Sequence, residues 1–331
     1  MTAHAPRRIP VYVVLPPRLL LLDVAGPMEV LRKANLEQSG VRFDVSYVGP
    51  LRKVGSSIGL GISPIAPLPA KLPDGAMLLV PGDADVPEGD AMTSPRQDEE
   101  GREAIVAWLR KVVRPGMRVV SICSGALLVG RAGLLDGHEC TTHHGCIDEL
   151  AREAPAARVR ENRLYVEDGE RLTSAGITAG IDLMLHVVAE LAGPAVAVAV
   201  ARYLVIYLRR AGGDPQLSPW LEGRNHLHAA IHRAQDAVAG DPARDWTVAS
   251  LARVAASSPR HLSRLFNEHA GMSVTDYVNR MRVALAKELL TGSRLDVEAV
   301  AERAGFGSAR QLRRAWGRLN DFPPSRIRSA V

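Results

Sequence analysis

LARVAASSPRHLSRLF at residues 251–266 recurs in altered form as VAERAGFGSARQLRRAW at residues 300–316. Each copy predicts a short helix with alanines three positions apart, a tight turn, and a second helix whose apolar residues recur every three or four positions. This succession of elements indicates a helix-turn-helix, and its repetition indicates two of them in tandem.

One face of each second helix is predicted to be buried and the other to be basic. Small alanines allow the two helices to cross closely, and the apolar face is supplied by Leu262, Phe266, Leu312 and Trp316. Ser258 and Ser308 stand at N-cap positions, so the first turn of each second helix can face a DNA groove. The exposed face carries side chains that can bind phosphates or base edges, namely Arg260, Ser263, Arg264, Arg310, Gln311, Arg313 and Arg314. A solvated charged face would explain one such helix, but two matching copies favour DNA binding.

The segment from Trp246 to Arg328 resembles the DNA-binding domain of the AraC/XylS family. The likeness rests on SPRHLSRLF at 258–266, on GMS at 271–273 and on FPPSRIR at 322–328. It implies an all-α domain in which a long helix, about residues 274–290, holds two recognition helices against successive major-groove segments.

Length and charge agree with a DNA-binding region joined to another domain. A chain of 331 residues exceeds the size at which single cores stop growing, about 250–300 residues. From Arg224 to Val331 there are 17 Lys and Arg against 10 Asp and Glu, whereas the preceding residues carry 24 against 26. The positive excess therefore lies in the repeated region and would attract phosphates, although RNA or an anionic membrane would attract it too.

The region before residue 190 alternates β-branched apolar runs with helical patterns. Buried strands are predicted at 9–15, 43–48, 75–80 and 118–122, and helices at 26–34, 101–113 and 125–132. This alternation predicts a doubly wound α/β domain of flavodoxin-like, amidotransferase-like fold, joined to the all-α domain with two helix-turn-helix motifs. Ligands bind beyond the carboxyl ends of such strands, where Asp23, the turn at 81–83 and Cys123 are predicted to lie.

Cys123 ends a predicted buried strand, and a helix opens at the residues that follow it. This is the arrangement of a nucleophile elbow, and the positive end of the helix dipole is expected to lower the pKa of the thiol. A cysteine in this position can also be a small buried hydrophobe, and the local pattern leaves both interpretations open.

The strings SICSGA (121–126), AGLLDG (132–137), TTH (141–143) and TSAGITAGIDL (173–183) resemble the ThiJ/PfpI group of class I glutamine amidotransferase-like domains. Such a domain, here about residues 9–192, followed by an AraC-type region is the architecture of GlxA-family transcriptional regulators. In enzymes of the group, isonitrile hydratases among them, the cysteine matched by Cys123 is the nucleophile. The resemblance also implies that Asp23 interacts with this cysteine, that His143 lies close by, and that amides near Gly82 and Ser124 form an anion-binding pocket.

Three departures from the group's pattern bear on catalysis. Ser124 stands where protease-like members carry His, Asp83 adds a negative charge to the pocket rim, and TTHH at 141–144 replaces TTHW. We therefore expect no catalysis, and an effector pocket formed by Asp23, Gly82, Asp83, Cys123, Ser124 and His143. The alternatives are a thiol-dependent hydratase or amidohydrolase with a DNA-binding tail, in which Cys123 and Asp23 are catalytic, and an oxidation sensor at Cys123.

Three regions are expected: an effector-sensing domain at 8–192, a connecting helix and linker at 193–223, and a DNA-binding domain at 224–331. The helix, about residues 194–210, is apolar on a broad face and either covers its own sheet or pairs with a second subunit. The Gly- and Pro-rich stretch 211–219 marks the linker. The family resemblance favours a homodimer that binds repeated half-sites.

Other polar residues are expected to be structural. Asp182 and His186 are predicted to face one another, and the histidines at 226, 228 and 232 lack further ligands at metal-binding spacing. No segment has the length and apolarity of a membrane span, no signal peptide pattern opens the sequence, and three cysteines without framework spacing fit a reducing cytoplasm. Neither a metal nor a cofactor is expected.

Together these features predict a cytoplasmic, sequence-specific regulator of transcription, taken to be an activator. Its expected partners are double-stranded promoter DNA, a small-molecule effector and RNA polymerase. The family resemblance alone points to amino acid derivatives or quaternary ammonium compounds as effectors.

Overall fold

The computed structural model describes residues 5–84, 93–206, 210–214, 216, 226, 228–320 and 322–330. The chain divides into two compact units, which we call unit 1 (Met1–Gln216) and unit 2 (Leu217–Val331). The predicted linker at 211–219 falls partly outside the described residues, and its described part belongs to unit 1. Within the described ranges, no helix combines the length and the apolarity needed to cross a membrane.

Unit 1 is an α/β domain whose described residues form a seven-stranded sheet of order β11-β12-β8-β7-β1-β3-β6. Neighbouring strands are parallel except at the β11–β12 pair, which confirms the predicted mostly parallel sheet. The strands are β1 (Arg7–Val14), β3 (Val41–Gly49), β6 (Ala66–Pro67), β7 (Met77–Val80), β8 (Arg118–Ile122), β11 (Tyr165–Asp168) and β12 (Arg171–Ser174). Two smaller sheets join β2 (Arg18–Leu19), β4 (Val54–Ser56) and β5 (Gly61–Ile62), and β9 (Glu139–Cys140) with β10 (Arg158–Val159).

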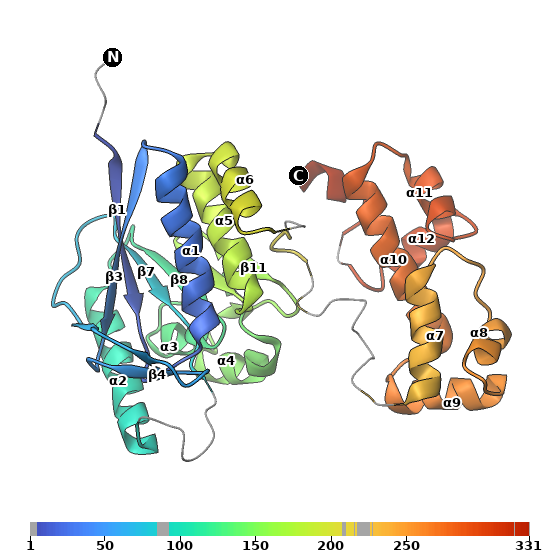
Figure 1. Cartoon of the computed structure of the whole chain (residues 1–331), viewed down its shortest axis with the longest axis horizontal. Coiled ribbons are helices and arrows are strands. Elements are labelled where there is room, and N and C mark those ends of the chain that lie inside the picture. Colours follow the sequence, from blue (N-terminus) through green and yellow to red (C-terminus); the bar gives the residue numbers. More distant parts are fainter. Residues whose placement is uncertain are drawn as a thin grey trace. The chain divides into compact units, whose positions relative to one another are not determined.

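Helices cover both faces of this sheet, as a doubly wound fold requires (Figure 1). One face is covered by α1 (Leu21–Glu37), α5 (Thr178–Ala192) and α6 (Pro194–Tyr203), and the other by α2 (Pro95–Val112), α3 (Gly125–Arg131) and α4 (Ile147–Glu153), which follows the 3-10 turn η1 (His144–Cys146). The central strands are apolar on both faces because each face contributes to a separate hydrophobic core. On β1, Val11 and Val13 belong to the core under α1, and Val14 belongs to the core under α2.

The predicted helix at 194–210 is wrong at its carboxyl end, because α6 ends at Tyr203. Val205 takes a left-handed conformation with φ 56°, and the Ile206 amide donates to the Ala201 carbonyl at 3.0 Å. This is a Schellman-type ending in which valine occupies the position usually held by glycine, so no glycine in the sequence marks the stop. The helix packs against α1 and α5, and therefore covers its own domain.

The prediction that Asp182 and His186 face one another is also wrong. Asp182 is buried and accepts from the Arg210 guanidinium at 2.5 and 3.0 Å. The His186 ring instead contacts the Glu167 carboxylate at 2.6 Å. Both partners come from segments that the local spacing does not relate to α5.

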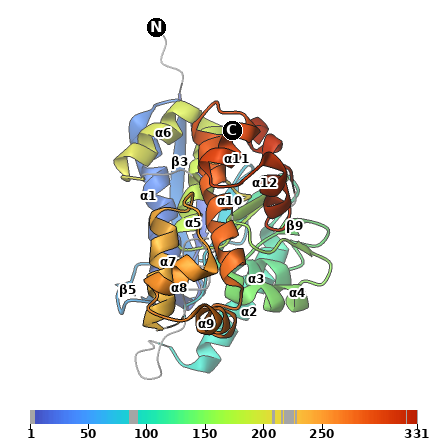
Figure 2. The same cartoon turned by 90° about the vertical axis from the view of Figure 1, so that its right-hand side faces the viewer.

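Unit 2 is all-α, as predicted, and contains two helix-turn-helix motifs joined by one long helix (Figure 2). The elements are α7 (Ala229–Gly240), α8 (Val248–Val254), α9 (Pro259–His269), α10 (Val274–Gly292), α11 (Val297–Arg303), α12 (Ala309–Trp316) and the 3-10 turn η2 (Pro324–Ala330). The first half of α10 packs into a core with α7, α8 and α9, and the second half into a core with α11 and α12. The predicted connecting helix at about 274–290 is thus confirmed.

Both helix-turn-helix motifs turn through a left-handed residue at the same relative position. Ala256 has φ 50° in the first, and Gly305 has φ 81° in the second. At Gly305 a side chain would also collide, since a Cβ there would lie 2.4 Å from the Ala243 carbonyl oxygen. The matching turns fix a similar crossing of the two helices in each motif.

Candidate functional site

The described structure offers two candidate sites, one at the end of β8 in unit 1 and one on the exposed faces of α9 and α12 in unit 2. In unit 1, Cys123 stands between β8 and α3 with φ 57°, a strained left-handed conformation for a side chain other than glycine. Gly125 makes this turn possible, because a Cβ there would lie 2.1 Å from the Val80 carbonyl oxygen. The predicted nucleophile-elbow geometry is therefore present.

Asp23, in the first turn of α1, lies at this elbow and is fully buried. Its carboxylate accepts from the Ile177 amide at 2.6 Å and from the Gly82 amide at 3.2 Å, and it is hydrogen-bonded to the Cys123 thiol. Gly82 must lack a side chain, since a Cβ there would lie 2.6 Å from the carboxylate and 2.9 Å from the Cys123 Cβ. Four segments distant in sequence thus meet at one carboxylate and one thiol.

The prediction of a lowered thiol pKa is wrong. Burial and, second, the negative charge of Asp23 together raise the pKa of Cys123 to about 12. Burial likewise raises the pKa of Asp23 to about 6, against the opposing effect of the hydrogen bonds from the Ile177 and Gly82 amides. Near neutral pH the pair is therefore a carboxylate and a protonated thiol. Desolvation and the charge of Asp23 raise the thiol pKa by more than the dipole of the short helix α3 lowers it.

The negative charge that Asp83 was predicted to add to the rim is balanced by a neighbouring arginine. Its carboxylate forms an ion pair with Arg102 of α2 at 2.7 Å, and its amide donates to the Ser124 hydroxyl at 3.0 Å. Burial nevertheless raises the pKa of Asp83 above its ordinary value. The Asp83 side chain thus ties the loop after β7 to α2, and Ser124 ties it to the elbow.

Among the contacts of the described residues, His143 is linked to the elbow through its neighbour Thr142. The Thr142 hydroxyl donates to the Cys123 carbonyl at 2.8 Å. The His143 ring accepts from the Gly145 amide at 3.3 Å and lies against the His144 ring, and burial lowers its pKa below the ordinary value for histidine. The His143 ring is therefore neutral near pH 7, and none of its described contacts is a hydrogen bond to the thiol.

Residues 210–214 and 216 form a segment that we call the strap. Sequence reasoning identified most of it as a linker but missed its contacts with the rest of unit 1. Arg210 holds one end of it through Asp182 and through the Thr178 hydroxyl at 2.8 Å. At the other end, the Gln216 side-chain amide donates to the Thr142 carbonyl at 2.8 Å. The Thr142 hydroxyl is in turn bonded to the Cys123 carbonyl. Thr178 directly follows Ile177, whose amide donates to Asp23. The strap is therefore connected to Cys123 through Thr142 and to Asp23 through residues 177–178.

In unit 2, the predicted caps and buried faces are present. The Ser258 hydroxyl accepts from the His261 amide and the Ser308 hydroxyl from the Gln311 amide, both at 3.3 Å. The residues predicted to be buried have at most 1% of their surface exposed, namely Ala252, Ala255, Leu262, Phe266, Ala301, Ala304, Leu312 and Trp316. These contacts turn the opposite faces of α9 and α12 to solvent.

The seven predicted DNA-binding residues are half-buried at Ser263 and exposed at the other six. Some are engaged within unit 2. Arg264 pairs with Glu268 at 2.8 Å, Arg313 pairs with Glu298 at 3.2 Å, and the Gln311 side chain accepts from the Gly307 amide at 3.0 Å. Among the described contacts, Arg260, Arg310 and Arg314 have no ion pair or hydrogen bond.

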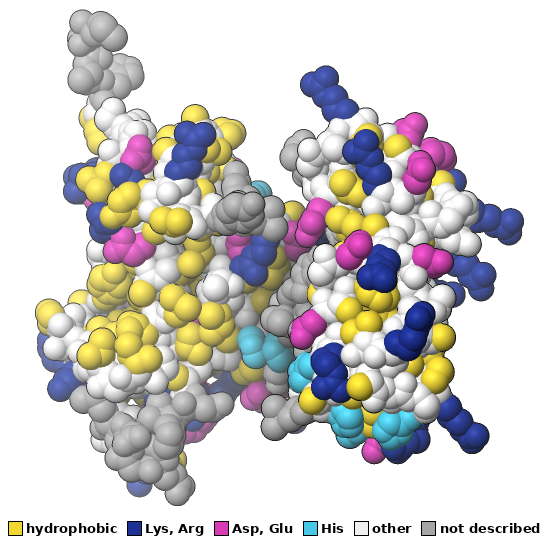
Figure 3. Space-filling view, turned by 45° about the vertical axis from the view of Figure 1, so that its right-hand side comes forward, with side chains coloured by type: hydrophobic (Ala, Val, Ile, Leu, Met, Phe, Trp, Pro, Cys, Tyr) yellow, Lys and Arg dark blue, Asp and Glu magenta, His cyan; other side chains and the backbone are white. Residues whose placement is uncertain are grey.

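Figure 3 shows Lys and Arg side chains extending from unit 2 well beyond the surface around them. Extended, unpaired guanidinium groups keep their charge available for an anionic partner, and arginine can bind either a phosphate or a guanine edge. No group of three potential metal-ligating side chains gathers anywhere in the part of the chain that the structure describes. The basic face of unit 2 is therefore suited to a polyanion.

Comparison with known proteins finds a match for each of the two regions. The model of the DJ-1/PfpI family matches residues 10–190, and a helix-turn-helix domain model matches residues 251–330. The HTH-type transcriptional regulator CdhR of Pseudomonas aeruginosa is 32% identical over 69% of this chain and 68% of its own length. The HTH-type transcriptional regulator GlxA of Rhizobium meliloti is 34% identical over 66% of this chain and 68% of its own length. An isonitrile hydratase of Pseudomonas putida is 34% identical over 54% of this chain and 69% of its own length.

Proposed function

The chain belongs to the DJ-1/PfpI family, and we propose that its α/β unit binds a small effector at the elbow without turning it over. The helix-turn-helix domain that follows makes the chain a transcriptional regulator, like its relatives CdhR and GlxA. The observation that carries the proposal is the Asp23–Cys123 pair. Backbone amides donate to the Asp23 carboxylate of this pair, and the pKa of the Cys123 thiol is raised to about 12. A thiol with this pKa stays protonated near neutral pH and is a poor nucleophile.

The chemistry of the rim indicates what such an effector is. Cys123 is 6% exposed and Ser124 is half-buried, so a ligand meets a thiol and a hydroxyl, and the fully buried Asp23 carboxylate lies behind the thiol. Asp23 is ionised near neutral pH in a buried place, and a ligand that brings a positive charge or hydrogen-bond donors would offset the cost of that burial. A small nitrogen-containing metabolite fits this environment.

A thermal-shift screen of small nitrogenous metabolites tests the effector proposal. A binding compound raises the unfolding temperature of the wild type, and the Asp23→Asn variant loses this rise because its side chain carries no charge. Arg96→Ala, on an exposed position of α2, serves as the control and should keep the rise. A compound that stabilises wild type and Asp23→Asn equally would place the effector elsewhere.

We further propose that unit 2 binds double-stranded promoter DNA in a sequence-specific manner, with α9 and α12 in successive major-groove segments. The unpaired guanidinium groups on both helices support this proposal. The caps at Ser258 and Ser308 also support it, because they let each helix begin at the surface with its first turn exposed to a DNA groove. The proposed regulator acts as a homodimer in the cytoplasm and as an activator in contact with RNA polymerase.

Selection from a random duplex library with the full chain tests the DNA-binding proposal. Repeated rounds should enrich a common motif, and charge reversal at Arg264 and Arg314 should abolish the enrichment. A library that stays unenriched with the wild-type chain, at moderate ionic strength, would refute sequence-specific binding.

A second candidate function is a thiol-dependent hydratase, favoured by the contact between Asp23 and Cys123 and by the relative named isonitrile hydratase. Incubation with an isonitrile, followed by chromatography for the hydrated product, decides between the two candidates. Hydration that Cys123→Ala abolishes would establish the enzyme, whereas its absence in the wild type favours the effector site.

A further inference from the structure

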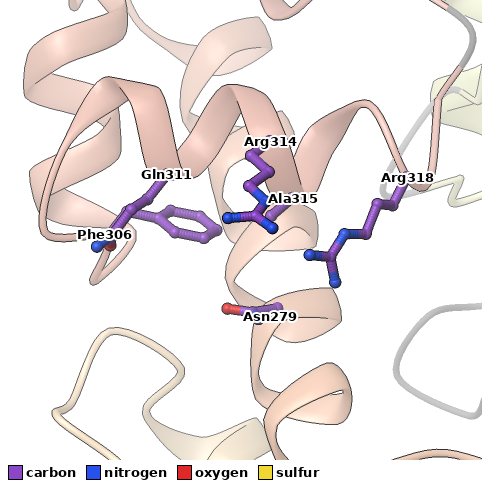
Figure 4. Close-up of a pocket in the computed structure, with 6 residues that line it drawn as sticks. All are labelled: Asn279, Phe306, Gln311, Arg314, Ala315 and Arg318. Atoms are coloured by element: carbon purple, nitrogen blue, oxygen red, sulfur yellow. The ribbon is translucent and has the colours of Figure 1, made fainter.

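A cavity of about 290 Å³ opens in unit 2 between α10 and α12, outside the elbow site (Figure 4). It is lined by Asn279, Phe306, Gln311, Arg314, Ala315 and Arg318. Two of these residues were predicted to contact DNA, but Asn279 and Arg318 were not. The cavity therefore extends the basic face of α12 in a direction that the helical pattern alone does not show.

The cavity has an apolar floor and a polar rim. Phe306 and Ala315 are 5% and 9% exposed, so they form a floor that holds little water. Figure 4 shows the guanidinium groups of Arg314 and Arg318 and the amide of Asn279 around the same opening. Guanidinium and amide groups supply several hydrogen-bond donors to one point, and donors beside apolar surface bind anions more strongly than donors in bulk water.

The charges around the opening are only partly balanced. Arg314 has no ion pair among the described contacts. Arg318 approaches the Asp276 carboxylate at 3.6 Å, and both side chains are about half exposed. Among the described residues, Asp276 thus partly balances Arg318 while Arg314 keeps its charge unbalanced, and this positive charge favours an anionic occupant.

The position of the cavity identifies the anion. A helix with its side chains is about 10–12 Å across, and the major groove is about 12 Å wide, so the phosphates of both strands lie along the flanks of a helix in the groove. The cavity lies on a flank of α12, toward α10, whereas Arg310 lies in the first turn, where base contacts are made. A group on the flank meets the phosphate backbone before it meets a base edge.

We propose that this cavity binds one phosphate of the DNA backbone, with Arg318, Arg314 and Asn279 as its donors. The proposal rests on the proposed DNA-binding function and deepens it. It divides the basic residues of α12 between two tasks, because Arg310 is left to read bases while the cavity fixes how far the helix enters the groove. Phosphate binding carries no sequence information, so the cavity should contribute equally on any duplex.

The test measures binding of the full chain to a mixed-sequence 30-base-pair duplex at several NaCl concentrations. Arg318→Ala is expected to weaken binding about tenfold and to reduce the slope of log K against log salt by about 0.9, the value for one lost phosphate contact. Asn279→Leu removes donors without removing charge, so it should weaken binding and leave the slope unchanged. Arg96→Ala in unit 1, which also removes one positive charge, is the matched control and should change neither quantity.

Asp276→Asn gives a result in the opposite direction. The asparagine can still accept from the Ser273 hydroxyl, as Asp276 does at 2.6 Å, but it no longer competes with DNA for Arg318. Affinity for the same duplex should therefore rise, and circular dichroism should show an unchanged fold.

An unchanged salt slope in Arg318→Ala, with wild-type binding intact, would overturn the phosphate site and leave the DNA-binding function standing. A slope that falls equally in Arg96→Ala would also overturn it, because the effect would then be one of net charge. If the wild-type chain bound no duplex at all, the DNA-binding function would fail together with the phosphate site.

Discussion

The elbow in unit 1 and the basic face of unit 2 hold their charges in opposite ways. Asp23 is fully buried, and its carboxylate accepts two backbone amides and a thiol. Arg310 on α12 is exposed and has no partner among the described contacts. A buried, fully bonded charge is bound up with the folding of its domain, whereas an exposed, unpaired charge is available to a partner outside the chain.

This difference separates what mutations should do in the two places. At the elbow, small changes of shape or charge should alter the stability of unit 1, because four segments pack on the pair without spare volume. On α9 and α12, the loss of a guanidinium should leave stability nearly unchanged and alter the binding of an anion. The following predictions test that separation, beginning with the largest effect.

Gly176→Ala should destabilise unit 1 by about 4 kcal/mol, from overpacking and backbone strain together. A Cβ at this position would lie 2.2 Å from the Cys123 Cβ, and φ there is 87°. Urea unfolding followed by circular dichroism measures the loss. Gly169→Ala is the matched control, since φ there is 60° but no atom lies within 4 Å, and it should cost only about 1 kcal/mol. Equal losses in the two variants would show that the elbow is not tightly packed.

The stability of unit 1 should depend on the titration of Asp23. Its pKa is raised from 3.8 to about 6 in the folded state, so the folded state binds the proton more tightly than the unfolded state does. Stability therefore rises by up to about 3 kcal/mol as the pH falls from above 6 to about 4. Asp23→Asn should lack this contribution, and the measurement is the difference between the two proteins in urea midpoint across that window. A difference that stays constant with pH would contradict the raised pKa.

Arg310→Ala should weaken binding to a selected DNA motif by about 1–3 kcal/mol relative to scrambled duplex, as expected for one base contact. Arg313→Ala removes the same charge from the same helix, but this guanidinium is already paired with Glu298 at 3.2 Å and should matter less. Fluorescence anisotropy on both duplexes gives the comparison, and thermal unfolding should show the two variants as stable as the wild type. If Arg313→Ala were the more damaging change, the unpaired cations would not be the ones that read DNA.

Much of both regions follows from local pattern. The strands β1, β3, β7 and β8, the elbow at Cys123 and the two helix-turn-helix motifs were predictable, because burial of an apolar run or stripe leaves a periodic signal in the sequence. The strands β6, β11 and β12 were not predicted. The end of α6 was not, because Val205 adopts a conformation that a glycine usually signals. The acid–base state of the elbow was not predictable either, since it depends on how deeply residues distant in sequence bury Asp23 and Cys123.

The different contacts of the arginines on α12 could not be predicted from the sequence either. A helical pattern places Arg310, Arg313 and Arg314 on one exposed face, but their partners come from other elements. Glu298 on α11 engages Arg313, and Asn279 on α10 joins Arg314 at the cavity. Spacing within one helix carries no information about such neighbours, so only the packed structure distinguishes the three.

The smallest effect is expected where the chain leaves unit 1. Gln216→Ala removes the hydrogen bonds that its side-chain amide donates to the Thr142 carbonyl at 2.8 Å and to the Thr141 hydroxyl at 3.4 Å, and should cost about 1 kcal/mol locally. The Leu164 and Tyr165 amides donate to the strap carbonyl of Gly212, so their hydrogen exchange should speed up about fivefold to tenfold. The amides of α2 serve as the internal control, because no strap contact reaches them among the described residues.

The Cys123→Ala variant tests whether the elbow and the strap are coupled. Thr142 donates to the Cys123 carbonyl and also accepts from Gln216, so faster exchange at Leu164 in Cys123→Ala as well would show that the buried elbow and the strap are mechanically coupled. Unchanged exchange in both variants would confine the elbow's influence to the stability of its own domain.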